Sequence, residues 1–378
     1  MRRIVVKVGT STLTGGSPTL DRVYINSLAA QIAQQRASGR QMALVTSGAV
    51  TAGMTGLGLS ERPRTIPGKQ AAASVGQGLL MALYADIFAN YGIPVGQVLL
   101  TREDLRSRER YVNARNTIEA LLVAGALPVI NENDTVATDE IRVGDNDTLA
   151  ALVTSLLDAD GLILLSDVPG LYDKNPTAFP DASLIERVER VDATTLAMAG
   201  GAGTPGGTGG MRTKLVAARI ATGSGAAMWI ASGRRPRVIE DCLNQIQHSG
   251  TYFAPANVRP SARKRWLAWA SGEPRGTVVV NTCARRALEE QGRSLLPIGV
   301  VRVDGDFSEG DLVAVADEEG QVFARGLTRY ARAEASRIAG CTTSDLAKRL
   351  DRPNTDTALG PPSPPSEIIH RDSLVLVP

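Results

Sequence analysis

Short apolar runs alternate with longer helical stretches through the first two-thirds of the chain, and each run ends in small or polar residues. This alternation is typical of an α/β domain whose sheet is mainly parallel and buried on both faces. Between the runs, Ala and Leu recur at helical spacing. The expected strands are Ile4–Val8, Met42–Thr46, Val95–Thr101, Leu127–Asn131, Gly161–Ser166 and Ala226–Ala231. The expected helices are Gln70–Asn90, Asn113–Ala124, Thr148–Leu157 and Met211–Ala221.

The character of the sequence changes between residues 256 and 276, where Pro, Ser and a cluster of Arg and Lys precede a new apolar run. Short strands separated by Asp-Gly and Glu-Gly turns follow, which predicts a small, mainly β second domain. We expect a first domain over residues 1–258, a linker over 259–274 and a second domain over 275–378. Residues 352–366, rich in Pro, Asn, Thr and Ser, are predicted to be a mobile insertion. The expected strands are Thr277–Val280, Ile298–Val303, Asp311–Ala316, Val322–Leu327 and Leu374–Val377.

Composition argues against several functional classes. Among 378 residues, 41 Lys and Arg balance 39 Asp and Glu, so no overall positive field marks an obligate nucleic-acid binder. Cys242, Cys283 and Cys341 are too widely spaced for a disulfide framework or a clustered zinc site, and we expect reduced thiols. The sequence opens on a strand, without a signal peptide or an apolar run long enough to cross a membrane. It therefore predicts a soluble cytoplasmic protein.

Lys7 interrupts the first apolar run. A charge there would be costly unless it reached a partner at the strand's end, and a polar ligand is the simplest partner. The alternative is a lysine paired with a structural carboxylate. Gly9, Thr10 and Ser11 follow, and a glycine turn with small hydroxyl residues leaves backbone N–H groups for phosphate oxygens. The order differs from the Walker motif, in which the lysine comes after its glycines.

A second lysine, Lys214, closes the glycine-rich segment 200–214 and belongs to the helical stretch that begins at Met211. A mobile glycine loop that brings a helix N-terminus and a lysine to a nucleotide is the functional interpretation. A plain flexible linker is the alternative. Two such lysines far apart in the chain suggest opposite ends of one polyphosphate, and hence a phosphoryl-transfer enzyme.

Acidic and amide side chains gather in two segments, Asn131-Glu-Asn-Asp134 and Val143-Gly-Asp145-Asn-Asp147. Asp147 precedes a helical stretch and could simply cap it. Capping accounts for one aspartate, whereas four acids in this span are better suited to binding a cationic amine, or to orienting a metal ion and the lysines. Asp167 follows a buried strand and is expected either to bind the nucleotide or to form a turn.

Histidine supplies negative evidence. His248 and His370 both lie away from these motifs, which argues against a catalytic triad, a zinc hydrolase or a histidine base. A carboxylate acceptor needs no strong base, because with a pKa near ~4.3 it is ionised at neutral pH. Its obstacle is repulsion from the γ-phosphate, which two lysines and Mg²⁺ would offset.

These motifs together resemble the amino-acid kinase family, and the resemblance covers nearly the whole chain. The family implies a three-layer α/β sandwich with a mainly parallel sheet. The most similar branch phosphorylates the side-chain carboxylate of L-glutamate with ATP and Mg²⁺, the first step of proline biosynthesis. The matching motifs are Val6-Lys7-Val-Gly-Thr-Ser, Val45-Thr-Ser47-Gly-Ala-Val, Asn131-Glu-Asn-Asp134, Val143-Gly-Asp-Asn146-Asp147, Ser166-Asp167-Val-Pro-Gly-Leu-Tyr and Thr208-Gly-Gly-Met-Arg-Thr-Lys214.

The resemblance also implies roles for individual residues. Ser47, Asp134 and Asn146 would hold glutamate. Lys7 and Lys214 would stabilise the transferred phosphoryl group, and Asp147 would orient both lysines. The ATP-binding residues would be Ser166, Asp167, Thr208, Gly209, Gly210, Met211, Arg212, Thr213 and Lys214, beside Lys7, Gly9, Thr10 and Ser11 from the phosphate argument. Feedback inhibition by L-proline and a homo-oligomeric assembly are further implications.

The second domain is similar to the PUA domain that follows the kinase in many bacterial members, through Ser294-Leu-Leu-Pro-Ile-Gly-Val and Phe307-Ser-Glu-Gly-Asp-Leu-Val. PUA domains elsewhere bind structured RNA, a role that fold alone does not transfer. Three other functions stay open: another small-acid kinase such as acetylglutamate kinase or aspartokinase, RNA binding through the second domain, and a nucleotide-binding sensor without catalysis. The basic residues that could serve RNA, or simply form a solvated face, are Arg325, Arg329, Arg332 and Arg337.

Overall fold

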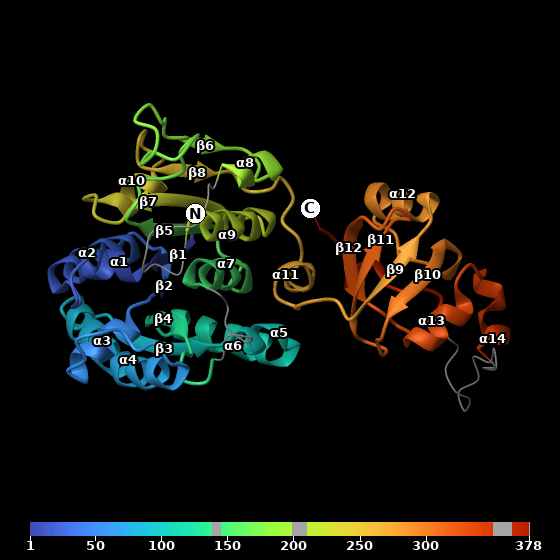
Figure 1. Cartoon of the computed structure of the whole chain (residues 1–378), viewed down its shortest axis with the longest axis horizontal. Coiled ribbons are helices and arrows are strands. Elements are labelled where there is room, and N and C mark those ends of the chain that lie inside the picture. Colours follow the sequence, from blue (N-terminus) through green and yellow to red (C-terminus); the bar gives the residue numbers. More distant parts are fainter. Residues whose placement is uncertain (138–144, 199–209, 351–364, 378) are drawn as a thin grey trace. The chain divides into compact units, whose positions relative to one another are not determined.

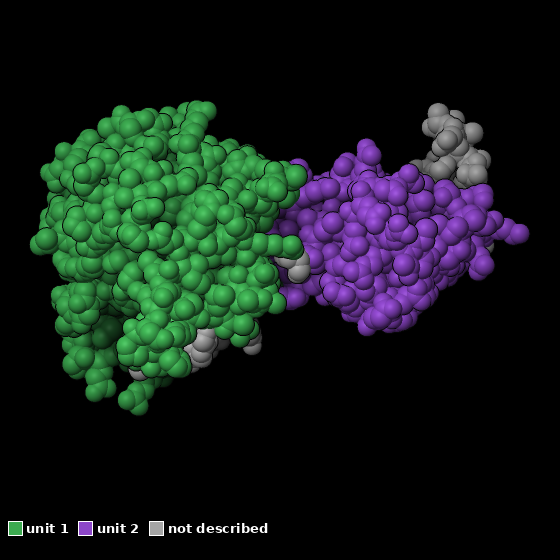
Figure 2. Space-filling model, turned by 90° about the horizontal axis from the view of Figure 1, so that it is seen from above, with its two compact units in different colours: residues 1–260 green, residues 261–378 purple. Residues whose placement is uncertain are grey.

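The computed structural model describes residues 1–137, 145–198, 210–350 and 365–377. The chain divides into two compact units, Met1–Pro260 and Ser261–Pro378, which Figure 2 shows in separate colours. The division falls shortly after the predicted end of the first domain, and the predicted linker contains helix α11 (Ala262–Trp269) of the second unit. The predicted insertion at 352–366 lies almost entirely outside the described residues.

The first unit is built on an eight-stranded sheet with the order β3-β4-β2-β1-β5-β7-β8-β6 (Figure 1). The first six strands in this order run parallel and β8 is antiparallel to β7, so the sheet is mainly parallel, as predicted. These six correspond to the six apolar runs, whereas the short strands β6 and β8 were not predicted. The strands are β1 (Arg3–Val8), β2 (Gln41–Val45), β3 (Val95–Leu100), β4 (Leu127–Glu132), β5 (Gly161–Ser166), β6 (Arg187–Val188), β7 (Ala227–Ser232) and β8 (Thr251–Phe253).

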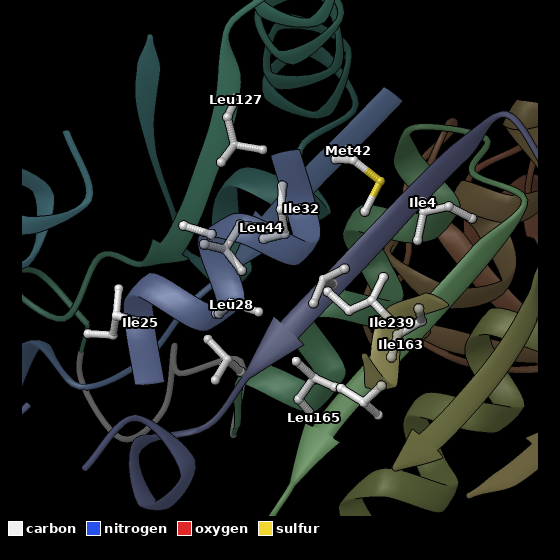
Figure 3. Close-up of a cluster of buried hydrophobic side chains, with 14 of the residues drawn as sticks. Ile4, Ile25, Leu28, Ile32, Met42, Leu44, Leu127, Ile163, Leu165 and Ile239 are labelled. Atoms are coloured by element: carbon white, nitrogen blue, oxygen red, sulfur yellow. The ribbon is translucent and has the colours of Figure 1, made fainter. Parts of the chain in front are cut away.

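Helices cover both faces of this sheet. Helices α2, α4 and α10 bury their apolar side chains with those of the strands in one core cluster, part of which Figure 3 shows. Helices α7 and α9 pack against β1, β5 and β7. The helices are α1 (Thr10–Thr14), α2 (Arg22–Ala37), α3 (Ala49–Gly56), α4 (Ile66–Ala89), α5 (Arg102–Arg106), α6 (Arg108–Val123), α7 (Asn146–Leu156), α8 (Ala193–Ala197), α9 (Met211–Gly223) and α10 (Val238–Leu243).

Strand alternation decides where Lys7 points. Ile4, Val6 and Val8 belong to the core cluster with α2, so Lys7 faces the opposite side of the sheet, where α7 packs on β1. The residue is only 8% exposed. A buried ammonium is costly without compensation, and its partners must therefore come from the helices on that face.

Helix α4 is long and apolar enough to cross a membrane by length and composition, which differs from the expectation that no run was. Packing accounts for part of its apolar character, because Leu80, Tyr84 and Phe88 are fully buried in the core cluster. Its backbone also touches α3: a Cβ atom on Gly76 would lie 1.8 Å from the carbonyl oxygen of Ala49. Glycine is required for this approach, which makes α4 part of the packed core.

The second unit has a five-stranded sheet with the order β10-β9-β11-β12-β13 and its own apolar core. Each strand overlaps one predicted strand. Among the four singled-out arginines, Arg329 pairs with Glu367, and Arg325 donates to the carbonyl of Gly272 at 3.4 Å. The elements after α11 are β9 (Gly276–Val280), α12 (Thr282–Gln291), β10 (Val300–Gly305), β11 (Leu312–Ala316), β12 (Val322–Leu327), α13 (Arg332–Ile338), α14 (Leu346–Arg349) and β13 (Leu374–Leu376), with single 3-10 turns at Pro297–Gly299, Thr343–Asp345 and Arg371–Ser373.

Candidate active site

The carboxyl ends of four neighbouring parallel strands meet at one edge of the first unit's sheet. Lys7 lies near the end of β1, Ser47 follows β2, Asn131 lies near the end of β4 and Ser166 ends β5. In open sheets of this kind, ligands bind beyond the carboxyl ends of the strands. The first turns of α7 and α9 reach the same edge. Asp147 of α7 contacts Lys7, and Lys214 of α9 contacts Asp147.

The charged partner of Lys7 is Asp147, in the first turn of α7. Its Oδ1 lies 2.6 Å from the Nζ of Lys7, and its Oδ2 accepts a hydrogen bond from the Nζ of Lys214 at 2.9 Å. The hydroxyl of Thr213 also donates to Oδ2, at 3.3 Å. One carboxylate therefore holds together two cations that are distant in sequence.

All three charged residues are buried: Asp147 is 1% exposed, and Lys7 and Lys214 are each 8% exposed. Burial by itself would raise the pKa of Asp147, but the charges of Lys7 and Lys214 outweigh it and lower that pKa from 3.8 to about 2. The carboxylate is thus ionised at neutral pH. Two cations and one anion leave the group with a net positive charge, which suits an anionic ligand.

Asp145, not Asp147, caps helix α7. Its Oδ1 accepts a hydrogen bond from the backbone N–H of Thr148 at 2.8 Å, so the interpretation of Asp147 as a cap was wrong. Burial and the nearby charge of Asp147 raise the pKa of Asp145. With the cap supplied two residues earlier, the carboxylate of Asp147 is left to bind the lysines.

Asn146 connects the ends of two strands, β2 and β4. Its Nδ2 donates to the carbonyl of Thr46 and to the hydroxyl of Ser47, both at 2.7 Å, and to Oδ1 of Asn131 at 3.0 Å. Two of the three predicted glutamate-binding residues, Ser47 and Asn146, are therefore in direct contact. The third, Asp134, is half-buried in the turn that follows β4.

The predicted nucleotide-binding residues lie at the ends of β1 and β5 and at the start of α9. Gly9 is the N-cap of α1, which begins with Thr10 and Ser11, and a Cβ atom at Gly9 would lie 3.4 Å from the Lys7 ammonium. The hydroxyl of Ser166 donates to Asp167 at 3.0 Å.

Helix α9 begins at Met211 with Arg212 in its first turn, and its N-cap, Gly210, has no side chain to occupy the free backbone N–H groups. Residues 200–209 of the predicted glycine loop lie outside the described residues, and with them the predicted ATP-binding residues Thr208 and Gly209, as do Val143 and Gly144.

Comparison with known proteins supports the family inferred from the motifs. Residues 2–232 match the amino acid kinase family, and residues 276–350 match the PUA domain. Glutamate 5-kinase of Moorella thermoacetica is 49% identical over 376 residues, which cover 100% of this chain and 96% of that protein. Glutamate 5-kinase of Herpetosiphon aurantiacus is 48% identical over 373 residues, covering 99% of this chain and 98% of that protein.

The chain belongs to the amino acid kinase family, among the glutamate 5-kinases. Its predicted fold class is confirmed: a kinase domain with a mainly parallel sheet, followed by a small β-rich PUA domain. Among solved structures, carbamate kinase from Giardia lamblia bound to AMP-PNP aligns over 68% of this chain and 99% of its own, with 18% identity and a TM-score of 0.48. That likeness is too distant to inform the chemistry.

The kinase domain also contains contacts that sequence reasoning missed. Thr46 takes part through its backbone carbonyl, for which sequence gives no signal. Asn131 stood in a recognised motif without an assigned role, and its Nδ2 donates to Gln77 of α4 at 2.9 Å. Gln77 belongs to no motif. Only the fold brings it beneath the end of β4.

No group of three or more His, Cys, Asp or Glu side chains suited to a metal ion occurs in the part of the kinase and PUA domains that the structure describes. The carboxylate nearest the cations, Asp147, is engaged by both lysines. Mg²⁺ characteristically binds through one or two carboxylates together with substrate phosphates, so this donor set fits an ion carried mainly by a nucleotide.

Proposed function

We propose that this chain transfers the γ-phosphoryl group of ATP to the side-chain carboxylate of L-glutamate, forming L-glutamyl 5-phosphate for proline biosynthesis. The observation that carries the proposal is the bridging of Lys7 and Lys214 by Asp147 at 2.6 and 2.9 Å. Support also comes from glutamate 5-kinases that align with essentially the full chain.

The chemistry requires cations more than a base. The glutamate carboxylate is already ionised at neutral pH, and both it and the γ-phosphate are anionic, so their approach is opposed by repulsion. Each lysine ammonium carries three N–H donors, and its bond to Asp147 leaves donors for phosphoryl oxygens. Asp147 would thereby orient Lys7 and Lys214 toward charge that spreads over the transferring group.

ATP is proposed to lie between the first turn of α9 and the turn at Gly9–Ser11. The N-terminus of α9 offers free backbone N–H groups and the positive end of the helix dipole. Ser166 and Asp167 would contact the nucleotide beside them. Mg²⁺ would be held mainly by phosphate oxygens, where it neutralises charge on the transferred group.

Glutamate is proposed to bind on the side of Ser47, Asp134 and Asn146. The Nδ2 of Asn146 donates to Thr46, Ser47 and Asn131. Its side-chain oxygen is therefore left to accept a hydrogen bond from the substrate, which suits an ammonium group. The carboxylate of Asp134 would complete the amine site. L-Proline carries the same α-carboxylate and an amine, so it would occupy part of this site as a feedback inhibitor that competes with glutamate.

The direct test is ATP turnover by the purified chain with L-glutamate, N-acetylglutamate and L-aspartate at matched concentrations. We expect glutamate to support a kcat/KM at least about tenfold above either analogue. N-Acetylglutamate has lost the ammonium that the site would bind, and the side chain of aspartate is one methylene shorter, which brings its carboxylate less close to the γ-phosphate. Equal or faster turnover of N-acetylglutamate or aspartate would assign the chain to another small-acid kinase.

We further propose that the active site belongs to the first unit alone, in a homo-oligomeric cytoplasmic enzyme. Every site residue named above precedes Pro260. Residues 1–260 should therefore retain glutamate-dependent ATP turnover, as expected of an autonomous domain. A truncated protein that folds and binds ATP without phosphorylating glutamate would contradict this. Salt-resistant, sequence-selective RNA binding by residues 273–378 would instead favour an RNA function for the PUA domain.

A further inference from the structure

A chain of side-chain amides leads from Asn146 away from the proposed glutamate site. The nitrogen of Asn146 is committed to Thr46, Ser47 and Asn131 at 2.7, 2.7 and 3.0 Å. An amide group has two ends of opposite character, a carbonyl acceptor and an NH₂ donor. Which end faces the ligand is therefore decided by what the other end contacts.

Two acceptors hold the Nδ2 of Asn146: the carbonyl of Thr46, which can only accept, and the side-chain oxygen of Asn131. The Oδ1 of Asn131 accepts hydrogen bonds from the backbone N–H of Glu132 at 2.9 Å and from Asn146 at 3.0 Å. Asn131 is only 2% exposed, so its NH₂ group needs a protein acceptor. If Asn131 were flipped, its NH₂ would meet the NH₂ of Asn146, donor against donor.

Gln77 supplies that acceptor. Residues Leu127 and Val129 face the core cluster that includes α4, and alternation places Asn131 on the same side of β4. There Nδ2 of Asn131 donates to Oε1 of Gln77 at 2.9 Å. The Nε2 of Gln77 in turn donates to Oε1 of Gln97 on β3 at 3.1 Å.

A second glutamine on α4 supports the same half of the site. Gln70 lies seven residues before Gln77, two helical turns away on the same face. Its Nε2 donates to the carbonyl of Ala137 at 3.2 Å, at the end of the turn that carries Asp134. Helix α4 thus holds both the end of β4 and the segment after it.

We propose that Gln77 is a positioning residue for the amino-acid substrate: it accepts from the NH₂ of Asn131 and so holds the Asn131 oxygen against Asn146, without touching substrate. The inference rests on the proposed glutamate site. It predicts that the acceptor oxygen of Gln77 is what matters. Loss of this acceptor should weaken glutamate binding and leave the nucleotide half, on α9 and β5, unaffected.

The test compares Gln77→Leu and Gln77→Lys, which remove the acceptor, with Gln77→Glu, which keeps it. Steady-state kinetics of the full chain would vary glutamate and ATP separately, with folding checked by thermal unfolding. We expect both loss variants to raise KM for glutamate roughly five- to tenfold, the effect of one hydrogen bond. KM for ATP and kcat should change less than about twofold, and Gln77→Glu should restore the glutamate KM.

A matched control is Gln34→Leu on α2, an exposed glutamine whose side chain donates to Glu240 at 3.3 Å, and it should behave as wild type. An unchanged glutamate KM in whichever loss variant folds would overturn the proposal. Equal losses for ATP and glutamate, or failure of Gln77→Glu to rescue, would overturn it too, since either would indicate a general structural role. Wild-type protein without glutamate-dependent turnover would instead sink the proposed function, and this inference with it.

Discussion

Lys7 and Asp147 form a buried ion pair of 2.6 Å, although one lies in the central strand β1 and the other in the first turn of α7. Alternation along β1 turns Lys7 toward the helix face, and the cap provided by Asp145 leaves Asp147 available to meet it. The same carboxylate holds Lys214 of α9 at 2.9 Å. Two helices and a strand are thus joined at the point where phosphoryl transfer is proposed.

The variant Asp147→Asn tests the bridge that the Asp147 carboxylate forms between Lys7 and Lys214. The amide keeps the shape but removes the charge that orients two buried cations, so kcat should fall by roughly 10²-fold or more. The unfolding free energy should drop by about 2–4 kcal/mol, because a buried charge pair is broken.

Asp160→Asn is the matched control. Asp160 accepts a hydrogen bond from the backbone N–H of Arg3 at 2.9 Å, just before β5 at the opposite edge of the same sheet. Its replacement should cost at most about 1 kcal/mol of unfolding free energy and leave kcat near wild type, because the hydrogen bond from Arg3 is only partly buried. Similar kcat values in both variants would show that Asp147 acts only on stability.

The low pKa of Asp147 predicts a pH-dependent stability. Because the folded-state pKa is about 2 and the ordinary value is 3.8, the contribution is complete above about pH 4 and is lost as the pH falls toward 2. Its size should be about 2 kcal/mol. Urea unfolding of wild type and Asp147→Asn across pH 3–6 measures it, and the stability difference should shrink at the acid end. A difference independent of pH would contradict the account.

The two lysines are expected to act on the transition state. Lys7→Met and Lys214→Met should each lower kcat by roughly 10²-fold or more while the protein stays folded. Lys348→Met, which replaces an exposed lysine on α14 of the second unit, is the control for losing a lysine and should have no effect. Near-normal kcat with only a raised KM for ATP would mean that both lysines bind the ground state alone.

Asp134 tests the amino-acid side of the site. Asp134→Ala should raise KM for glutamate much more than KM for ATP, because the substrate ammonium loses its anionic partner. Proline inhibition should weaken in parallel if the inhibitor shares the site. Thr135→Ala, an exposed neighbour in the same turn, is the control. Unchanged glutamate KM in Asp134→Ala would place the amine elsewhere.

Sequence reasoning worked best where burial was most uniform. Strands β1, β4 and β5 are covered on both faces, so each reads as an apolar run with a clear end. The edge strand β6 and its neighbour β8 are only two and three residues long and left no such pattern. Helix α2 was also missed, since polar residues fill much of its length.

The charged residues of the site could be predicted from the sequence, but the contacts between them could not. Lys7 and Lys214 could be singled out because charge in an apolar or glycine-rich setting requires a partner. Asp147 stood out as part of an acidic cluster, and its role toward the lysines came from the family resemblance. Which of Asp145 and Asp147 caps α7 depends on the register of one helical turn, and spacing did not decide it. Gln77 gave no signal at all, because its role depends on α4 lying beneath the end of β4.

Trapping of the product with hydroxylamine tests the central claim most directly. An acyl phosphate reacts with hydroxylamine to give a hydroxamate, so phosphorylation of the glutamate side chain should yield γ-glutamyl hydroxamate and ADP in equal amounts. We expect this stoichiometry for the wild-type chain, with both products falling together by roughly 10²-fold in Lys214→Met. ADP formation without hydroxamate would show that the phosphoryl group does not go to the glutamate carboxylate, and would contradict the account.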